Sequence, residues 1–194
     1  MRSLSASRAC LPYRIRTTDH NCPPVQSHDS DRKLQGHSVM SGALAQESQS
    51  ITLLFQYGVV SATDIITWAD SLVEKMDSPP DALLDLSATP SHKTGDILSC
   101  LHRLSAGADF WDALRKTLPR LRDFIAAHPD QAENIAHHLS GTVLSFDYSE
   151  VPADLRFPDR IDDAFSLARQ GTYGTRETAY QYFLLELNKF QPTL

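Results

Sequence analysis

The sequence has little of what several protein classes require. Its three cysteines show no C-x-x-C spacing, which excludes a disulfide framework and a zinc knuckle and is typical of reduced thiols in the cytoplasm. It lacks the apolar run of roughly 7–15 residues that a secretory signal needs, and its composition excludes a multi-span membrane protein. Basic residues are also in the minority, with 18 Lys/Arg against 24 Asp/Glu. We therefore expect neither a membrane nor a nucleic acid as partner, because an acidic surface repels phosphates.

The charge is divided unevenly along the chain. Up to Ser48 there are six Lys/Arg and four Asp/Glu, whereas the remainder has 12 and 20. The first segment shows no sustained hydrophobic period, so it buries too little apolar surface to offset the entropy of ordering. We expect a disordered leader over residues 1–47 and a helical domain over residues 48–194. Two alternatives for the leader stay open: its arginines resemble those of a transit peptide, or translation starts at Met40.

The rest of the sequence is patterned as a succession of helices. Ser61 and Asp64 have the spacing of a capping box, and apolar residues follow at i, i+3 and i+4 intervals. We expect further helices to begin near residues 49, 81, 94, 109, 130, 159 and 175, with Pro119 kinking or dividing one of them. Residues 142–146 alone have a strand-like composition, and a helical continuation fits them equally well. The sequence predicts an all-α fold: a single compact domain of about seven helices.

One group of residues has the composition of a metal site. Glu133 and His137 are four residues apart on one predicted helix, and His138 adjoins them. The H-E-x-x-H order and a third ligand are both missing, and such a pair is more typical of an exposed helix-stabilising contact. A small helical metal-binding protein or enzyme that uses these three residues is therefore the alternative hypothesis. We assign no catalytic residue and no cofactor.

Clustered acids are the candidate partner-binding residues. Three lie in the first turn of one predicted helix and two on a short helix, where they also favour the helix dipole or simply face solvent. These residues are Asp81, Asp85, Asp159, Asp162 and Asp163.

Four basic residues gather on another helix and raise the possibility of phosphate contact. They are Arg115, Lys116, Arg120 and Arg122. Asp112 and Asp123 flank them, and the whole domain is acidic, so a solvated face is the favoured interpretation over a nucleic-acid site.

Several short motifs resemble those of a group of small, uncharacterised, all-helical bacterial proteins. The motifs are Gly58-Val-Val-Ser61, Trp68-Ala69-Asp70, Asp77-Ser-Pro79-Pro80 and Leu86-Ser87. Some proteins of this type resemble immunity proteins of bacterial toxin systems. The resemblance implies a helical fold and a protein partner, and it carries over no catalytic residue. We therefore predict a non-enzymatic, cytoplasmic protein-binding module. Its acidity suits electrostatic steering toward a basic toxin.

Overall fold

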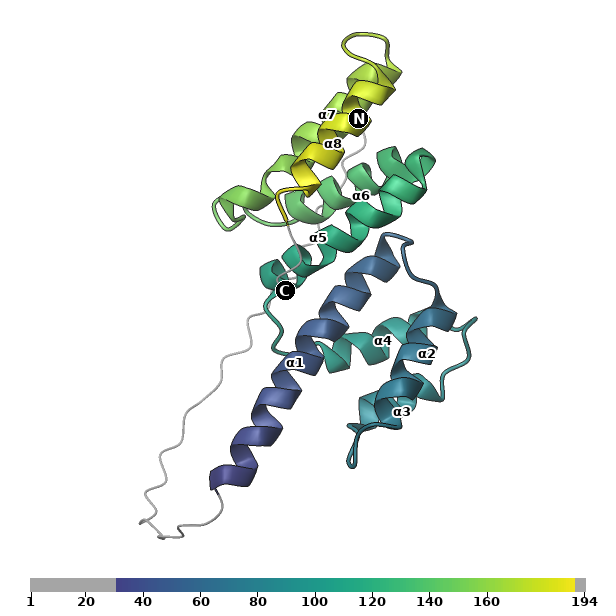
Figure 1. Ribbon diagram of the computed structural model, residues 1–194, viewed down its shortest axis with the longest axis vertical. Coiled ribbons are helices and arrows are strands. Elements are labelled where there is room, and N and C mark those ends of the chain that lie inside the picture. The colour runs from purple at the N-terminus through teal and green to yellow at the C-terminus, as the bar shows by residue number, and fades with distance from the viewer. Residues whose placement is uncertain (1–30, 191–194) are drawn as a thin grey trace, which may run out of the picture.

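The computed structural model describes the backbone of residues 31–190 and the side chains of residues 42–190. This part of the chain is entirely helical, which confirms the expected all-α class (Figure 1). The α-helices are α1 (Asp31–Gln56), α2 (Ala62–Val73), α3 (Asp81–Ser87), α4 (Thr94–Leu104), α5 (Phe110–Ala127), α6 (Ala132–Leu144), α7 (Phe157–Arg169) and α8 (Arg176–Leu187). Two short 3₁₀ turns, η1 (Pro129–Gln131) and η2 (Ala153–Leu155), precede α6 and α7. None of the described helices is both long and apolar enough to cross a bilayer.

Helix starts follow local hydrogen-bonding chemistry where a side chain caps them. Ser61 and Asp64 form the expected capping box: Ser61 Oγ accepts from the Asp64 amide, and the Ser61 amide donates to Asp64 Oδ2 at 2.8 Å. Asp109 and Thr175 cap α5 and α8 in the same way. Helices α3, α4, α6 and α7 begin without a side-chain cap, and the N-cap residue of α4 is Lys93.

Helix α1 spans the boundary that the sequence predicts after residue 47. Helix α1 passes through this position without a break from Asp31 onward, and Ala45 and Ser48 are buried. Gln46 also pairs with the backbone of Asp109, donating to its carbonyl at 2.9 Å and accepting from its amide at 3.1 Å. These contacts are long-range, so hydrophobic periodicity along the sequence does not show them. The remainder of the expected leader, residues 1–30, lies outside the described residues.

Two later helices also run on past the residues expected to interrupt them. Pro119 lies buried within α5, which continues as one helix to Ala127, so of the two outcomes expected at this residue the division into two helices does not occur. Helix α6 continues past Gly141 to Leu144, which makes the start of the strand-like segment helical. In both helices buried apolar residues stand on either side of the interruption, and their packing outweighs the unfavourable local propensity.

The helices pack around two hydrophobic clusters that share α1. One cluster combines α1 with α2, α3 and α4, and the other combines α1 with α5 to α8. Ile51 belongs to the first cluster, whereas Leu53 and Leu54 belong to the second. In Figure 1 α1 runs as a long diagonal past both groups of helices. Because α2 and α3 stand apart from α6 to α8, the two groups present separate surfaces.

Candidate functional site

One acidic part of the domain is the acidic hairpin, which we define as residues 62–87, from α2 through the connecting turn to α3. It contains six acids and a single base, Lys75. All six acids are exposed. They are Asp64, Asp70, Glu74, Asp77, Asp81 and Asp85. A partner approaching α2 and α3 therefore meets a concentrated negative charge.

Three of these carboxylates have internal partners. Ser61 lowers the pKa of Asp64 through hydrogen bonds from its hydroxyl and its amide. Asp70 accepts a hydrogen bond from the hydroxyl of Ser87, which joins α2 to α3. Asp85 pairs with Arg103 of α4, with 2.5 Å between Oδ2 and Nη2. These contacts hold the hairpin against its neighbours.

The other three carboxylates are unpaired. Glu74, Asp77 and Asp81 make no hydrogen bond or ion pair through their side chains within the described residues. Glu74 is the C-cap of α2, whose last turn has no basic residue. A negative charge at this end of a helix opposes the helix dipole and costs stability. Helix stability therefore does not account for the acid at this position, which makes Glu74 a candidate for binding.

The five acids predicted to bind a partner do not form one surface. Asp81 and Asp85 lie in the acidic hairpin, whereas Asp159, Asp162 and Asp163 lie on α7 beside the other cluster. Among the three on α7, Asp162 is partly buried, and it faces His137 with 3.2 Å between Oδ2 and Nδ1.

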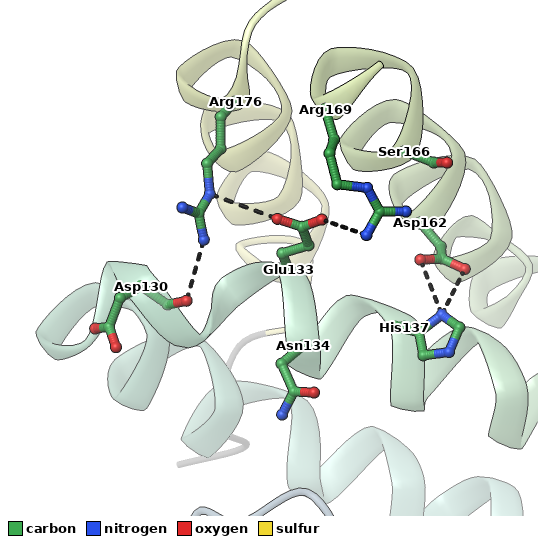
Figure 2. Close-up of a pocket in the computed structure, with 8 residues that line it drawn as sticks. All are labelled: Asp130, Glu133, Asn134, His137, Asp162, Ser166, Arg169 and Arg176. Atoms are coloured by element: carbon green, nitrogen blue, oxygen red, sulfur yellow. Dashed lines mark hydrogen bonds and ion pairs between the residues drawn. The ribbon is translucent and has the colours of Figure 1, made fainter.

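A second candidate is the polar cleft, a hollow of about 540 Å³ between α6, α7 and the start of α8. Glu133 lies at its centre, and Figure 2 shows it between the guanidinium groups of Arg169 and Arg176. The two N–O distances are 3.4 Å to Arg169 and 3.6 Å to Arg176. The pair formed by His137 and Asp162 closes one side of the cleft.

The residues considered for metal binding are engaged otherwise. Glu133 faces two arginines and His137 faces Asp162, so Glu133 and His137 do not pair with each other along α6 as expected. His138 lies next to His137, with ring centroids 6.2 Å apart. Over the described residues, no three His, Cys, Asp or Glu side chains are placed to hold a metal ion. The geometry therefore gives no support to the metal-binding alternative.

The basic residues of α5 are mostly neutralised. Arg115 donates two hydrogen bonds to Asp154 of η2, at 2.8 and 3.0 Å, and these contacts lower the pKa of the Asp154 carboxyl. Two further ion pairs are Lys116 with Asp112 and Arg122 with Asp123. Arg120 alone of the four has no recorded partner among the described residues, and it lines a small cleft beside Glu47 and Asp64. A phosphate backbone would have to compete with these carboxylates.

Sequence reasoning did not identify the polar cleft, although a signal for it was present. Asp162, Ser166 and Arg169 are spaced i, i+4 and i+7, which places them on one face of α7. That polar row lies along the cleft with Glu133 and His137 of α6 opposite. The periodicity shows the row, but only the packing of α6 on α7 shows what it faces.

Comparison of the chain with protein-family models, with curated proteins and with solved structures gave no match.

Proposed function

We propose that the protein is a non-enzymatic module that binds a basic protein partner through the acidic hairpin. The observation that carries this proposal is the set of three exposed, unpaired carboxylates at the turn between α2 and α3, namely Glu74, Asp77 and Asp81. Their carboxylate oxygens are available to a partner because none of the three forms a hydrogen bond or an ion pair in the described structure. Such charges accelerate association with a basic surface and help to select it over other surfaces.

An exposed apolar side chain adds to the binding potential of α3. Leu84 is 43% exposed and stands between Asp81 and Asp85 in sequence. Interfaces typically combine an apolar centre with a polar rim. Leu84 supplies such an apolar contact within the charged surroundings of the hairpin.

We further propose that the partner is a toxin that this protein neutralises. The resemblance to immunity proteins supports this narrower function, and its motif residues have structural roles that suit it. Trp68 donates through Nε1 to Glu47 at 3.0 Å, and the contact between Ser87 and Asp70 ties α3 to α2. The first contact ties the hairpin to α1, and the second fixes α3 relative to α2. A preformed surface loses little entropy on binding, as a tight inhibitor requires.

The proposal is tested with the protein encoded by the neighbouring reading frame. Its affinity is measured calorimetrically for the wild type and for a triple variant, Glu74→Gln, Asp77→Asn and Asp81→Asn. We expect the hairpin variant to bind at least about tenfold more weakly and with a shallower dependence on salt. If the wild type does not bind this protein, the proposal fails.

A second triple variant provides the matched control. Glu150→Gln, Asp159→Asn and Asp163→Asn remove the same charge from exposed carboxylates that have no recorded partner in the described structure. We expect this variant to bind as the wild type does. If only this control variant bound more weakly, the partner would bind at α7 and the loop before it, and the assignment to the hairpin would be overturned.

The toxin-neutralising function has a separate readout. Expression of the neighbouring protein alone should stop cell growth, and co-expression of the wild-type chain should restore it. The hairpin variant should restore growth less well than the control variant. A neighbouring protein that binds without being toxic would leave protein binding standing and remove the immunity function.

A further inference from the structure

We propose that the polar cleft binds the phosphate group of a small ligand, held between Arg169 and Arg176. This site lies on α6, α7 and α8 and is independent of the acidic hairpin.

The chain reversal between α7 and α8 positions both arginines. Arg169 is the last residue of α7 and Arg176 the first of α8. The turn between these helices brings their guanidinium groups to opposite sides of Glu133, which belongs to α6 (Figure 2). Three elements thus hold two cations close together in an otherwise acidic domain.

The donors of both guanidinium groups are largely unused. The contacts from Glu133 to the arginines are ion pairs of 3.4 and 3.6 Å, and the described structure records no hydrogen bond in either. Arg176 donates one hydrogen bond, from Nη2 to the carbonyl oxygen of Asp130 at 3.2 Å. A guanidinium has five N–H donors in a planar fork that matches phosphate oxygens. A phosphate between the two arginines would find donors on both sides.

The charged side chains of the cleft are two arginines and three acids, and Glu133 is the acid that contacts the arginines. Glu133 balances one of the two cations and keeps them together when no ligand is bound. Asp162 faces His137, and the carboxylate of Asp130 accepts from Gln131 and points away from Glu133 in Figure 2. Neither Asp130 nor Asp162 forms an ion pair with Arg169 or Arg176 in the described structure, so the unused guanidinium donors are the groups that an anion would contact at the centre of the cleft.

The hollow is larger than a phosphate group requires. Its volume of about 540 Å³ falls within the range of small-molecule sites. A second hollow of about 240 Å³ shares Asp130 and Arg176 with it and is lined partly by Pro129, Phe165 and Tyr180. A phosphate ester could therefore place its anionic group at the arginines and an apolar group beside Tyr180. Free phosphate is the other source of the same chemistry.

Calorimetric titration of the full chain with inorganic phosphate and with phenyl phosphate, at low salt, tests the proposal. We expect saturable binding of one equivalent, with phenyl phosphate tighter than inorganic phosphate. Equal affinities would identify the free anion as the ligand and would still support the phosphate site. The absence of saturable binding of both probes up to about 10 mM would overturn the proposal.

Variants of the cleft test which residues hold the anion. Arg169→Gln with Arg176→Gln should weaken binding at least about tenfold. Glu133→Gln should tighten it, because a competing negative charge is removed. The control, Arg120→Gln with Arg160→Gln, removes two exposed cations from outside the cleft.

The outcomes of the variants are distinguishable from a general loss of structure. Arg169 and Arg176 are 69% and 61% exposed in their side chains, so their replacement should leave the thermal unfolding midpoint nearly unchanged. Unchanged binding in the cleft variant, or an equal loss in the control variant, would show non-specific attraction and overturn the site. Weaker binding with Glu133→Gln would overturn the role assigned to Glu133.

Discussion

Single side chains determine where several helices begin, and Ser61 shows this most directly. Replacing Ser61 with Ala removes both hydrogen bonds that its hydroxyl makes with Asp64. We expect the free energy of unfolding in urea to fall by about 0.5–2 kcal/mol. Ser91→Ala is the control, because Ser91 is exposed and makes no side-chain hydrogen bond among the described residues. Equal effects of the two replacements would contradict a capping role for Ser61.

Asp154 provides a prediction about pH at the same scale. Its pKa is lowered from 3.8, first by the hydrogen bonds from Arg115. A lowered folded-state pKa contributes stability that is present above the ordinary carboxyl pKa and is lost as the pH falls through the folded-state value. Asp154→Asn should therefore reduce stability near neutral pH by at most about 1 kcal/mol, since the pair is half exposed. The difference from the wild type should shrink progressively as the pH falls below the ordinary carboxyl pKa.

The loss of stability expected in Asp154→Asn arises from the ion pair between Arg115 and Asp154. Adding Arg115→Gln to the Asp154→Asn variant should change the stability near neutral pH only slightly, because the contact is already gone. A difference between wild type and Asp154→Asn that persists at low pH would mean that the aspartate acts through something other than its charge.

Helix α2 and helix α3 place acids at opposite ends of their dipoles. Glu74 caps the C-terminus of α2, whereas Asp81 lies in the first turn of α3. Glu74→Gln should raise the free energy of unfolding by about 0.3–1 kcal/mol, and Asp81→Asn should lower it by a similar amount. Denaturation in urea at low salt measures the free energy of unfolding of both variants. The same sign for both replacements would show that general charge repulsion outweighs the dipoles.

The elements that sequence predicts correctly are those whose boundaries are set by neighbouring residues. Ser61, Asp109 and Thr175 each cap a helix three residues before the amide that they accept from, so a short window of sequence contains the whole interaction. The passage of α1 through residues 45–48 and the continuity of α5 through Pro119 depend instead on packing against distant helices. A prediction from local spacing has no access to that packing.

The candidate sites show the same contrast between what the local sequence predicts and what only the packing of helices determines. Charge counts locate the acids of the hairpin, but they do not show that Asp85 is paired with Arg103 while Asp81 is not. In the cleft, the sequence suggests a contact between Glu133 and His137 along one helix. Each residue contacts a different helix in the structure, because α7 and the start of α8 supply closer partners of opposite charge.

At the scale of the whole molecule, α1 links two hydrophobic clusters, and each cluster has one tryptophan beside it. Trp68 packs against the cluster of α2 to α4, and Trp111 packs against that of α5 to α8. Because Ile51, Leu53 and Leu54 of α1 are buried in one cluster or the other, we expect the clusters to unfold together. Trp68→Phe and Trp111→Phe each leave one reporter, whose fluorescence in urea should coincide with far-ultraviolet circular dichroism.

If the fluorescence and circular dichroism transitions of either variant did not coincide, the two clusters would be separate cooperative units. The comparison is made within each variant, so a change in overall stability caused by the replacement does not affect it. Separate transitions would also identify which cluster opens first.

Cys100 is buried in the cluster of α2 to α4, so the reactivity of its thiol reports when that cluster opens. Cys100 is 7% exposed and is the one cysteine among the described residues. An alkylating reagent reaches its thiol only when α4 separates from its neighbours, so in a Cys10→Ser and Cys22→Ser background the alkylation rate measures that opening. A protein bound to the acidic hairpin should slow alkylation, because α3 packs directly on α4. Mass spectrometry of this single thiol would thus detect occupancy of the hairpin even for a partner that is not yet purified.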